Sequence, residues 1–275
     1  GHPIFWGEEH FNKFYFTSSN KIFSDKISKF VFNTNKASDG AVMNRLARVF
    51  DHFFIDEVQD LAGFDLELIK LLFSTSSHVV LVGDPRQVTY LTHVSTKFKK
   101  YRNGQIREFV LTELGRKIEC TVDDTTLSKS HRNNQKICSL ANQLYPDFAP
   151  AVPCSCVSCR EFETDHEGVF WIKEEEVNEY IEKFQPTQLR WSSAVQCAEG
   201  APVMNFGESK GLSFERVLIY PTEKMAKWIQ DQSYDLKNET RAKLYVGVTR
   251  AKRSATFVLT HQEDGLEIVE RYSLA

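Results

Sequence analysis

Short apolar runs alternate with amphipathic segments along the first half of the chain. Residues 53–55 (FFI) and 79–82 (VVLV) are apolar runs of strand length, and residues 65–73 between them place their apolar side chains on one helical face. Each run ends abruptly, the first in the acids 56–57 and the second in the Gly-Asp-Pro turn 83–85. Two buried strands joined by a helix predict a βαβ unit with a parallel sheet.

The same alternation continues towards the C-terminus. Further strands are expected at 109–111, 169–172, 217–220 and 256–259. Helices are expected at 41–49, within 127–145, at 174–184 and at about 239–252, and residues 146–159 are expected to form a loop. The pattern therefore indicates an α/β protein, although the first forty residues show no clear period.

The acids after the first apolar run have the form of a Walker B element. In that element one carboxylate binds Mg²⁺ and a second lies beside the water that attacks a phosphate, and Asp56 and Glu57 provide such a pair. Ligands gather at the carboxyl ends of parallel strands, which is where these acids fall. By itself the pair is more typical of an ordinary strand that ends in solvated acids.

Composition narrows the class of protein. The 275 residues carry a net charge of −3, which excludes a polycation that binds nucleic acid by bulk charge but leaves a local basic groove open. With 41% hydrophobic and 26% charged residues, the composition is that of a soluble globular protein. No apolar run is long enough to span a membrane, and six Cys are too few for a disulfide scaffold, so a cytoplasmic location is expected.

Five motifs occur in the order in which a known protein family has them. Residues 56–60 (DEVQD) and 83–87 (GDPRQ) resemble motifs II and III of the superfamily-one helicases of the UvrD/Rep type. Residues 127–133 (LSKSHRN), 208–214 (ESKGLSF) and 245–252 (YVGVTRAK) resemble motifs IV, V and VI of the same family.

The resemblance implies a fold and an activity. The fold would be α/β with two RecA-like P-loop NTPase lobes, over residues 1–115 and 116–275, the first incomplete at its N-terminus. The activity would be that of an ATP-dependent DNA helicase or translocase that uses ATP and Mg²⁺ to move on single-stranded DNA, in DNA repair or anti-phage defence. A nuclease subunit would be a further partner.

The resemblance also implies a role for each matching residue. Asp56 would bind Mg²⁺ and Glu57 would polarise the attacking water, while Gln87 would sense the γ-phosphate. Arg132 and Arg250 would act as arginine fingers that stabilise the charge of the transition state.

The remaining matching positions are assigned to binding. Asp84, Lys210 and Gly211 would contact the nucleotide. Tyr90 would stack on a nucleobase and Thr249 would contact DNA. Without the family match, an Arg on a helix or a Tyr near a strand end is more often an ordinary structural residue.

One family element is missing from this sequence. None of the 13 Gly is followed by Lys, so the chain contains no Walker A motif to hold the phosphates. Either the sequence is part of a longer protein that carries this motif, or it is a catalytically inactive helicase-like subunit that binds DNA or a nuclease. The retained acids and arginines favour the first interpretation, and the chain alone is expected to hydrolyse ATP poorly or not at all.

A cysteine cluster in the expected loop raises a separate question. Three thiolates from Cys154, Cys156 and Cys159 with the imidazole of His166 would form a legitimate tetrahedral zinc set. Their spacing is not a standard one, and a tight loop can also hold free thiols. Zinc is therefore disfavoured at this stage.

Overall fold

The structure is a computed structural model that describes residues 6–76, 78–92, 96–115, 118–159, 164–260 and 266–273. It divides into two compact units. Unit 1 comprises residues 1–85 and 90–122, and unit 2 comprises 86–89 and 123–275. The short segment 86–89 packs with unit 2 although both of its neighbours in sequence belong to unit 1. The predicted lobe boundary between residues 115 and 116 stays a prediction.

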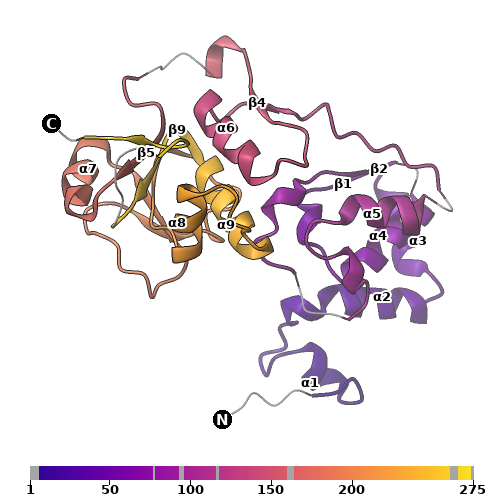
Figure 1. Cartoon of the computed structure of the whole chain (residues 1–275). Helices are drawn as coiled ribbons and strands as arrows, with labels where there is room; N and C mark the ends of the chain where they lie inside the picture. Colours follow the sequence, from indigo (N-terminus) through magenta and orange to yellow (C-terminus); the bar gives the residue numbers. More distant parts are fainter. Residues whose placement is uncertain are drawn as a thin grey trace. The chain divides into compact units, whose positions relative to one another are not determined.

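Unit 1 contains the expected βαβ unit. Strands β1 (His52–Ile55) and β2 (His78–Leu81) pair in parallel, with Phe53 opposite Val79, and α4 (Phe64–Thr75) connects them (Figure 1). This confirms the predicted βαβ unit and parallel pairing, but the expected burial of the strands is wrong, because every second residue of each is exposed, Phe54 to 73%. The other helices of unit 1 are α1 (Phe11–Tyr15), α2 (Ile27–Ala37), α3 (Ala41–Val49) and α5 (Ile106–Phe109), with a π-helical turn at Val110–Leu114 and 3₁₀ turns at Ser24–Lys26, Val58–Asp60 and Lys99–Tyr101.

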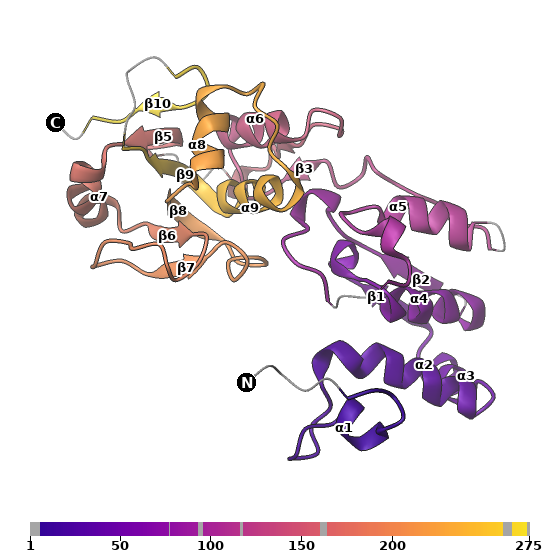
Figure 2. The same cartoon turned by 60° about the horizontal axis from the view of Figure 1, so that its bottom comes forward.

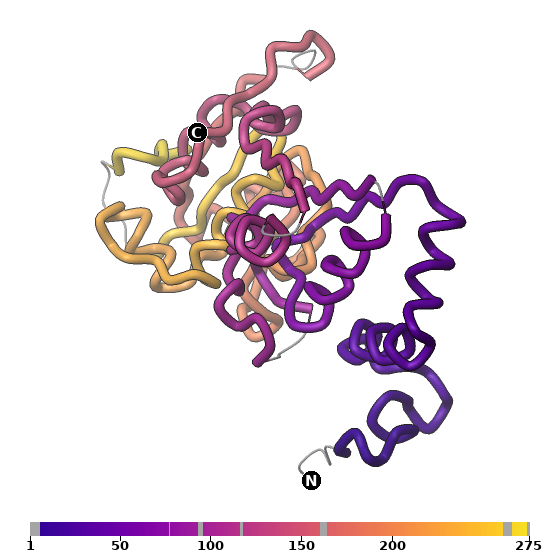
Figure 3. Tube along the Cα trace, turned by 90° about the vertical axis from the view of Figure 1, so that its right-hand side faces the viewer, coloured from indigo at the N-terminus to yellow at the C-terminus, as the bar shows by residue number. Residues whose placement is uncertain are grey.

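The apolar core of unit 1 is built around α4. Helix α2 packs against α3 and α4, and the Cα trace follows these N-terminal helices in indigo to violet (Figure 3). Leu66 and Ile69 of α4 are buried against Phe109 and Leu114. The strand predicted at 109–111 is therefore wrong. The apolar positions 106, 109, 110 and 114 follow a helical period, and this period places them against α4.

Unit 2 is built on a six-stranded parallel sheet. Its strand order is β10-β5-β9-β8-β6-β7, and Figure 2 shows these strands side by side. The strands are β5 (Gly168–Ile172), β6 (Thr187–Arg190), β7 (Val203–Asn205), β8 (Phe214–Ile219), β9 (Ala251–Val258) and β10 (Glu270–Arg271). A separate parallel pair is formed by β3 (Lys129–Ser130) and β4 (Val152–Pro153). Parallel sheets in an α/β protein agree with the predicted fold class.

Helices cover both faces of this sheet. They are α6 (Gln135–Leu144), α7 (Val177–Phe184), α8 (Glu223–Gln230) and α9 (Asn238–Thr249), with 3₁₀ turns at Pro85–Gln87, Val157–Cys159 and Glu174–Glu176. Val217 and Ile219 of β8 face the core that includes α6, α8 and α9, whereas Leu218 between them faces α7. Because successive side chains point to opposite faces, a strand buried on both sides is apolar throughout. This explains why three strands of this sheet were predicted correctly.

Two boundaries differ from the prediction. The last helix ends at Thr249, so the expected helical residues 251 and 252 already belong to β9. The expected loop 146–159 contains β4, which pairs with β3 and is too short to show a pattern. None of the helices within the described residues is long and apolar enough to cross a membrane.

Candidate active site

The acids of the Walker B-like element leave the carboxyl end of β1 in unit 1. Asp56 is exposed, and its Oδ1 accepts the backbone N–H of Glu57 at 2.7 Å. Glu57 has a left-handed φ of 53°, which is uncommon for a residue with a Cβ and often marks functional sites. The backbone N–H of Val58 donates to Val82 O at 3.2 Å, so this turn stays joined to the end of β2.

Gln59 connects these acids to the turn after β2. Its Nε2 donates to Glu57 Oε2 at 2.5 Å, and its Oε1 accepts the backbone N–H of Asp84 at 3.2 Å. Gln59 is only 3% exposed, and a Cβ on Gly83 would lie 2.3 Å from its Oε1. Glycine is therefore required for this close approach. Gln59 was not assigned a role from the sequence, although it is the Gln of the DExQD pattern.

The chemistry of these groups suits a nucleotide–metal site. Mg²⁺ prefers carboxylate oxygens and retains several waters, and an exposed carboxylate such as that of Asp56 meets this requirement. The hydrogen bond from Gln59 fixes the direction of the Glu57 carboxylate. A carboxylate that positions a water molecule has to be held in this way. Asp84 is half-buried beside them.

In unit 2, Arg250 joins three of the sequence motifs. It lies between the end of α9 and the start of β9 and is 2% exposed. Its Nη1 donates to Leu212 O and its Nη2 donates to Gln87 Oε1, both at 3.2 Å. Gln87 belongs to the segment 86–89, so motifs III, V and VI meet at one guanidinium group within this unit.

Two residues of motif IV bind the backbone on either side of Arg250. Arg132 Nη1 and Asn133 Nδ2 both donate to Thr249 O at 3.1 Å, and Asn133 Nδ2 also donates to Ala251 O at 2.7 Å. Burial lowers the pKa of the Arg132 guanidinium. Asn133 was not singled out in the sequence, where only its position directly after Arg132 could have indicated a role.

The remaining predicted residues are placed as follows. Gly211 has φ +79°, and the position of its missing Cβ faces open space, so the left-handed backbone is what requires glycine. Thr249 is buried, and its Oγ1 donates to Tyr245 O at 2.8 Å. Tyr90 is 56% exposed in unit 1. The DNA-binding roles of Thr249 and Tyr90 and the nucleotide-binding roles of Asp84, Lys210 and Gly211 stay predictions.

Comparison with known proteins shows which helicases the chain is similar to. Residues 15–103, which include both acidic motifs, match the family described as UvrD/REP helicase N-terminal domain. The chain is UvrD/Rep-like. It is 25% identical over 225 residues to the probable DNA helicase of Mycoplasma pneumoniae, covering 74% of this chain and 42% of that protein.

Two further similarities are more limited. The RecBCD enzyme subunit RecB of Borreliella burgdorferi is 26% identical over 128 residues, covering 46% of this chain and 10% of RecB. The arterivirus nonstructural protein 10 helicase, solved with DNA, has a TM-score of 0.45 and 19% identity, covering 75% of this chain and 39% of that one. The UvrD/Rep-like chain thus spans less than half the length of these relatives.

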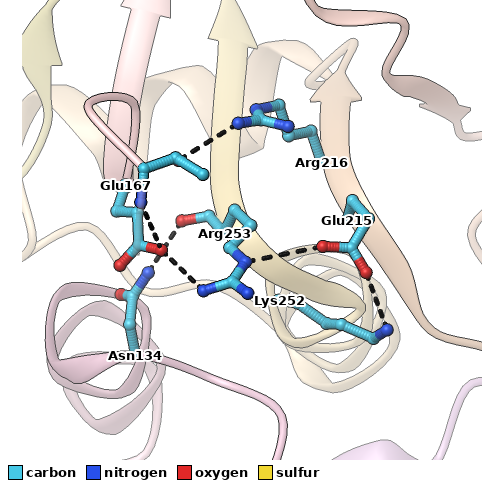
Figure 4. Close-up of polar contacts among 7 residues, drawn as sticks. Asn134, Glu167, Glu215, Arg216, Lys252 and Arg253 are labelled. Carbon is cyan, nitrogen blue, oxygen red and sulfur yellow. Dashed lines mark hydrogen bonds and ion pairs between the residues drawn. The ribbon is translucent and has the colours of Figure 1, made fainter. Parts of the chain in front are cut away.

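Ion pairs fix the strand that follows motif VI of this UvrD/Rep-like chain (Figure 4). Arg253 Nη1 lies 2.8 Å from Glu167 Oε1, and its Nε lies 3.5 Å from Glu215 Oε2. Lys252 Nζ lies 2.7 Å from Glu215 Oε1, and its hydrogen bond lowers the pKa of Glu215. Asn134 donates to Arg253 O at 2.7 Å and also caps α6 by accepting the N–H of Ile137. Helix α6, which follows motif IV, is therefore connected to β9 through Asn134.

His166 is not grouped with the cysteines, so the ligand set considered from the sequence is wrong. It is 4% exposed, its Nε2 lies 2.7 Å from Tyr180 Oη, and its ring stacks on Phe170 and Phe184 at 4.3 and 4.1 Å between centroids. His131 takes its place, with Nδ1 at 3.6 Å from Cys159 Sγ. The spacing in sequence pointed to His166 because His131 lies 23 residues before Cys154 and approaches the cysteines only through the pairing of β3 with β4.

The stability of unit 2 is expected to depend on the protonation of His166. Burial, together with the cations Arg216 and Lys183, lowers the pKa of His166 to about 4 from the ordinary value of 6.5. Below pH 6.5 the unfolded chain takes up a proton that the folded chain excludes. The stability contributed at neutral pH is therefore lost as the pH falls from 6.5 to about 4, by on the order of 3 kcal/mol.

Urea unfolding between pH 7 and pH 4 tests this expectation. His166→Gln keeps an acceptor for the Tyr180 hydroxyl but cannot titrate, so its stability should fall less steeply over this range than that of the wild type. The cysteines and the acidic residues are the same in both proteins and cancel in the comparison. Identical pH profiles would show that His166 does not carry this dependence.

Proposed function

We propose that this chain carries the Walker B acids and the arginines of an ATP-dependent DNA helicase or translocase that moves on single-stranded DNA. The main support is the junction at Arg250, where hydrogen bonds join residues of four motifs that are far apart in sequence: Gln87, Arg132, Leu212 and Thr249. A purely structural role for these motifs would not require a guanidinium group to contact the Gln of motif III.

Each residue contributes a distinct interaction in this proposal. Asp56 is the metal ligand, and Glu57, held by Gln59, orients the attacking water. Arg132 and Arg250 supply positive charge to the transferring phosphoryl group. ATP with Mg²⁺ supplies the phosphoryl group and neutralises part of its charge when bound.

The same contacts suggest how hydrolysis is coupled to DNA. Arg250 donates to Gln87, which lies three positions before the exposed Tyr90. Arg250 would contact the phosphates when ATP is bound, and its hydrogen bond to Gln87 would connect that contact along the chain to Tyr90, the proposed stacking residue. Single-stranded DNA is the proposed partner. The similarity to RecB, a subunit of a larger enzyme, is compatible with a protein partner such as a nuclease subunit. A cytoplasmic location and a role in repair or defence stay predictions.

DNA-stimulated ATP hydrolysis tests the proposal. The natural protein that contains these 275 residues is expected to hydrolyse ATP at least roughly tenfold faster with single-stranded DNA than without it, because DNA binding aligns the catalytic groups. The control variant is Lys227→Gln, since Lys227 is an exposed residue of α8 that forms an ion pair with Glu223 one helical turn away. Tight DNA binding without any stimulated hydrolysis would contradict the proposal and favour a non-catalytic helicase-like subunit.

A further inference from the structure

One histidine and three cysteines converge beside motif IV in unit 2. His131 directly follows β3, and Cys154 directly follows β4. These strands are parallel, with Ser130 opposite Pro153, so their carboxyl ends lie side by side. The backbone N–H of Cys154 also donates to Ser130 O at 2.9 Å, which continues the pairing into the cluster.

The ligand atoms lie at distances that suit one metal ion. His131 Nδ1 is 3.6 Å from Cys159 Sγ and 3.8 Å from Cys156 Sγ, and Cys154 Sγ is 3.1 Å from Cys156 Sγ. All four atoms lie within 4.8 Å of one another. Tetrahedral zinc, with bonds of about 2.3 Å to sulfur and about 2.0 Å to nitrogen, places neighbouring ligand atoms roughly 3.5–3.8 Å apart.

We propose that His131, Cys154, Cys156 and Cys159 bind a structural Zn²⁺ ion. Soft thiolates with one imidazole select zinc over Mg²⁺ or Ca²⁺, which prefer oxygen ligands. Four protein ligands complete a tetrahedron and leave no open position, which is typical of structural and not of catalytic zinc sites. Ser158 Oγ lies 3.6 Å from Cys156 Sγ, so this sulfur also has a hydrogen-bond donor outside the ligand set.

The proposed ion has a specific effect on the neighbouring motif. It links the end of β3 to the segment that follows β4, and His131 is adjacent to Arg132 in sequence. Because Arg132 donates to Thr249 O, the ion fixes the backbone from which this arginine reaches motif VI. This positioning role rests on the proposed function, whereas binding of zinc does not.

Metal content is the direct test. The 275-residue chain is purified without a polyhistidine tag and without chelators, and its zinc content is measured by inductively coupled plasma mass spectrometry. We expect about one zinc per chain in the wild type and less than about 0.2 in His131→Ala and Cys159→Ser, because each loses one of four ligands. Matched controls are His166→Gln and Cys197→Ser, a histidine and a cysteine outside the cluster, which should retain the zinc.

Further measurements keep the proposal falsifiable if an alanine variant fails to fold. His131→Cys replaces the imidazole by a fourth thiolate and is expected to keep the zinc, and Co²⁺ in the wild-type chain should give the visible absorption of a tetrahedral thiolate site. A folded, reduced wild-type chain that takes up no added zinc would overturn the proposal. So would a disulfide between Cys154 and Cys156 in the isolated protein, or zinc that persists in both His131→Ala and Cys159→Ser.

None of these readouts depends on ATP hydrolysis. Zinc bound by a chain whose natural protein does not hydrolyse ATP would leave the metal site intact and refute only the proposed function.

Discussion

Replacing Arg250 by Ala is expected to lower the DNA-stimulated ATP turnover of the natural protein by about 10³-fold or more, which is the range for loss of an arginine finger. The guanidinium group also joins Gln87 to Leu212, so the remaining turnover should lose its stimulation by single-stranded DNA as well. Turnover is measured at saturating ATP with and without DNA, because nucleotide binding itself should change little.

Arg250 is buried, so a loss of turnover must be separated from a loss of folding. Arg250→Lys retains the positive charge but not the forked geometry that reaches two acceptors, and it should remain strongly impaired with a near-normal melting temperature. The matched control is Arg107→Lys, an exposed arginine of α5 whose ion pair with Glu108 at 3.9 Å needs no forked geometry. A folded Arg250→Ala protein with normal turnover would remove Arg250 from the catalytic residues.

The second large effect is expected at Glu57. Glu57→Gln should lower the rate of hydrolysis by about 10²–10⁴-fold, the usual range for loss of a general base. The amide of glutamine has the same shape, and its oxygen still accepts the hydrogen bond from Gln59, so the turn after β1 should be unchanged. Single-turnover hydrolysis measures the chemical step directly, and ATP binding should persist.

The same chemical change outside the site is the control. Glu67→Gln in α4 removes a half-buried ion pair with Lys97 and should leave hydrolysis unchanged, because Glu67 belongs to none of the motifs. Equal rates for Glu57→Gln and the wild type would assign the attacking water to another group and would weaken the proposed Walker B role of these acids.

The central strands β5, β9 and β8 of the six-stranded sheet were predictable because their burial leaves apolar runs in the sequence. Strand β6 was not, because its buried Gln188 donates to Ala198 O and Ala201 O and interrupts the apolar pattern. The run at Phe109 was assigned to a strand because three adjacent apolar residues do not distinguish a strand from a helix. Only packing against α4 decides between them.

The sequence motifs of the candidate site were predictable, but the hydrogen bonds that join their residues were not. The resemblance named Glu57 and Arg132. Gln59, which holds Glu57, and Asn133, which shares the acceptor Thr249 O with Arg132, become evident only from their hydrogen bonds. The cysteine cluster illustrates the same limit. His166, which is near the cysteines in sequence, packs among aromatic rings. His131, which is distant in sequence, lies beside the cysteines because β3 pairs with β4.

The strand order of unit 2 has a consequence for synthesis on the ribosome. Strand β5 is buried along its whole length, and its two neighbours in the sheet, β9 and β10, are translated after α7, α8 and α9. At about 5–20 residues per second, this apolar strand waits on the order of ten seconds with both edges open. The nascent chain is therefore expected to need chaperone protection at β5, and proteins interrupted before β9 should aggregate through that strand.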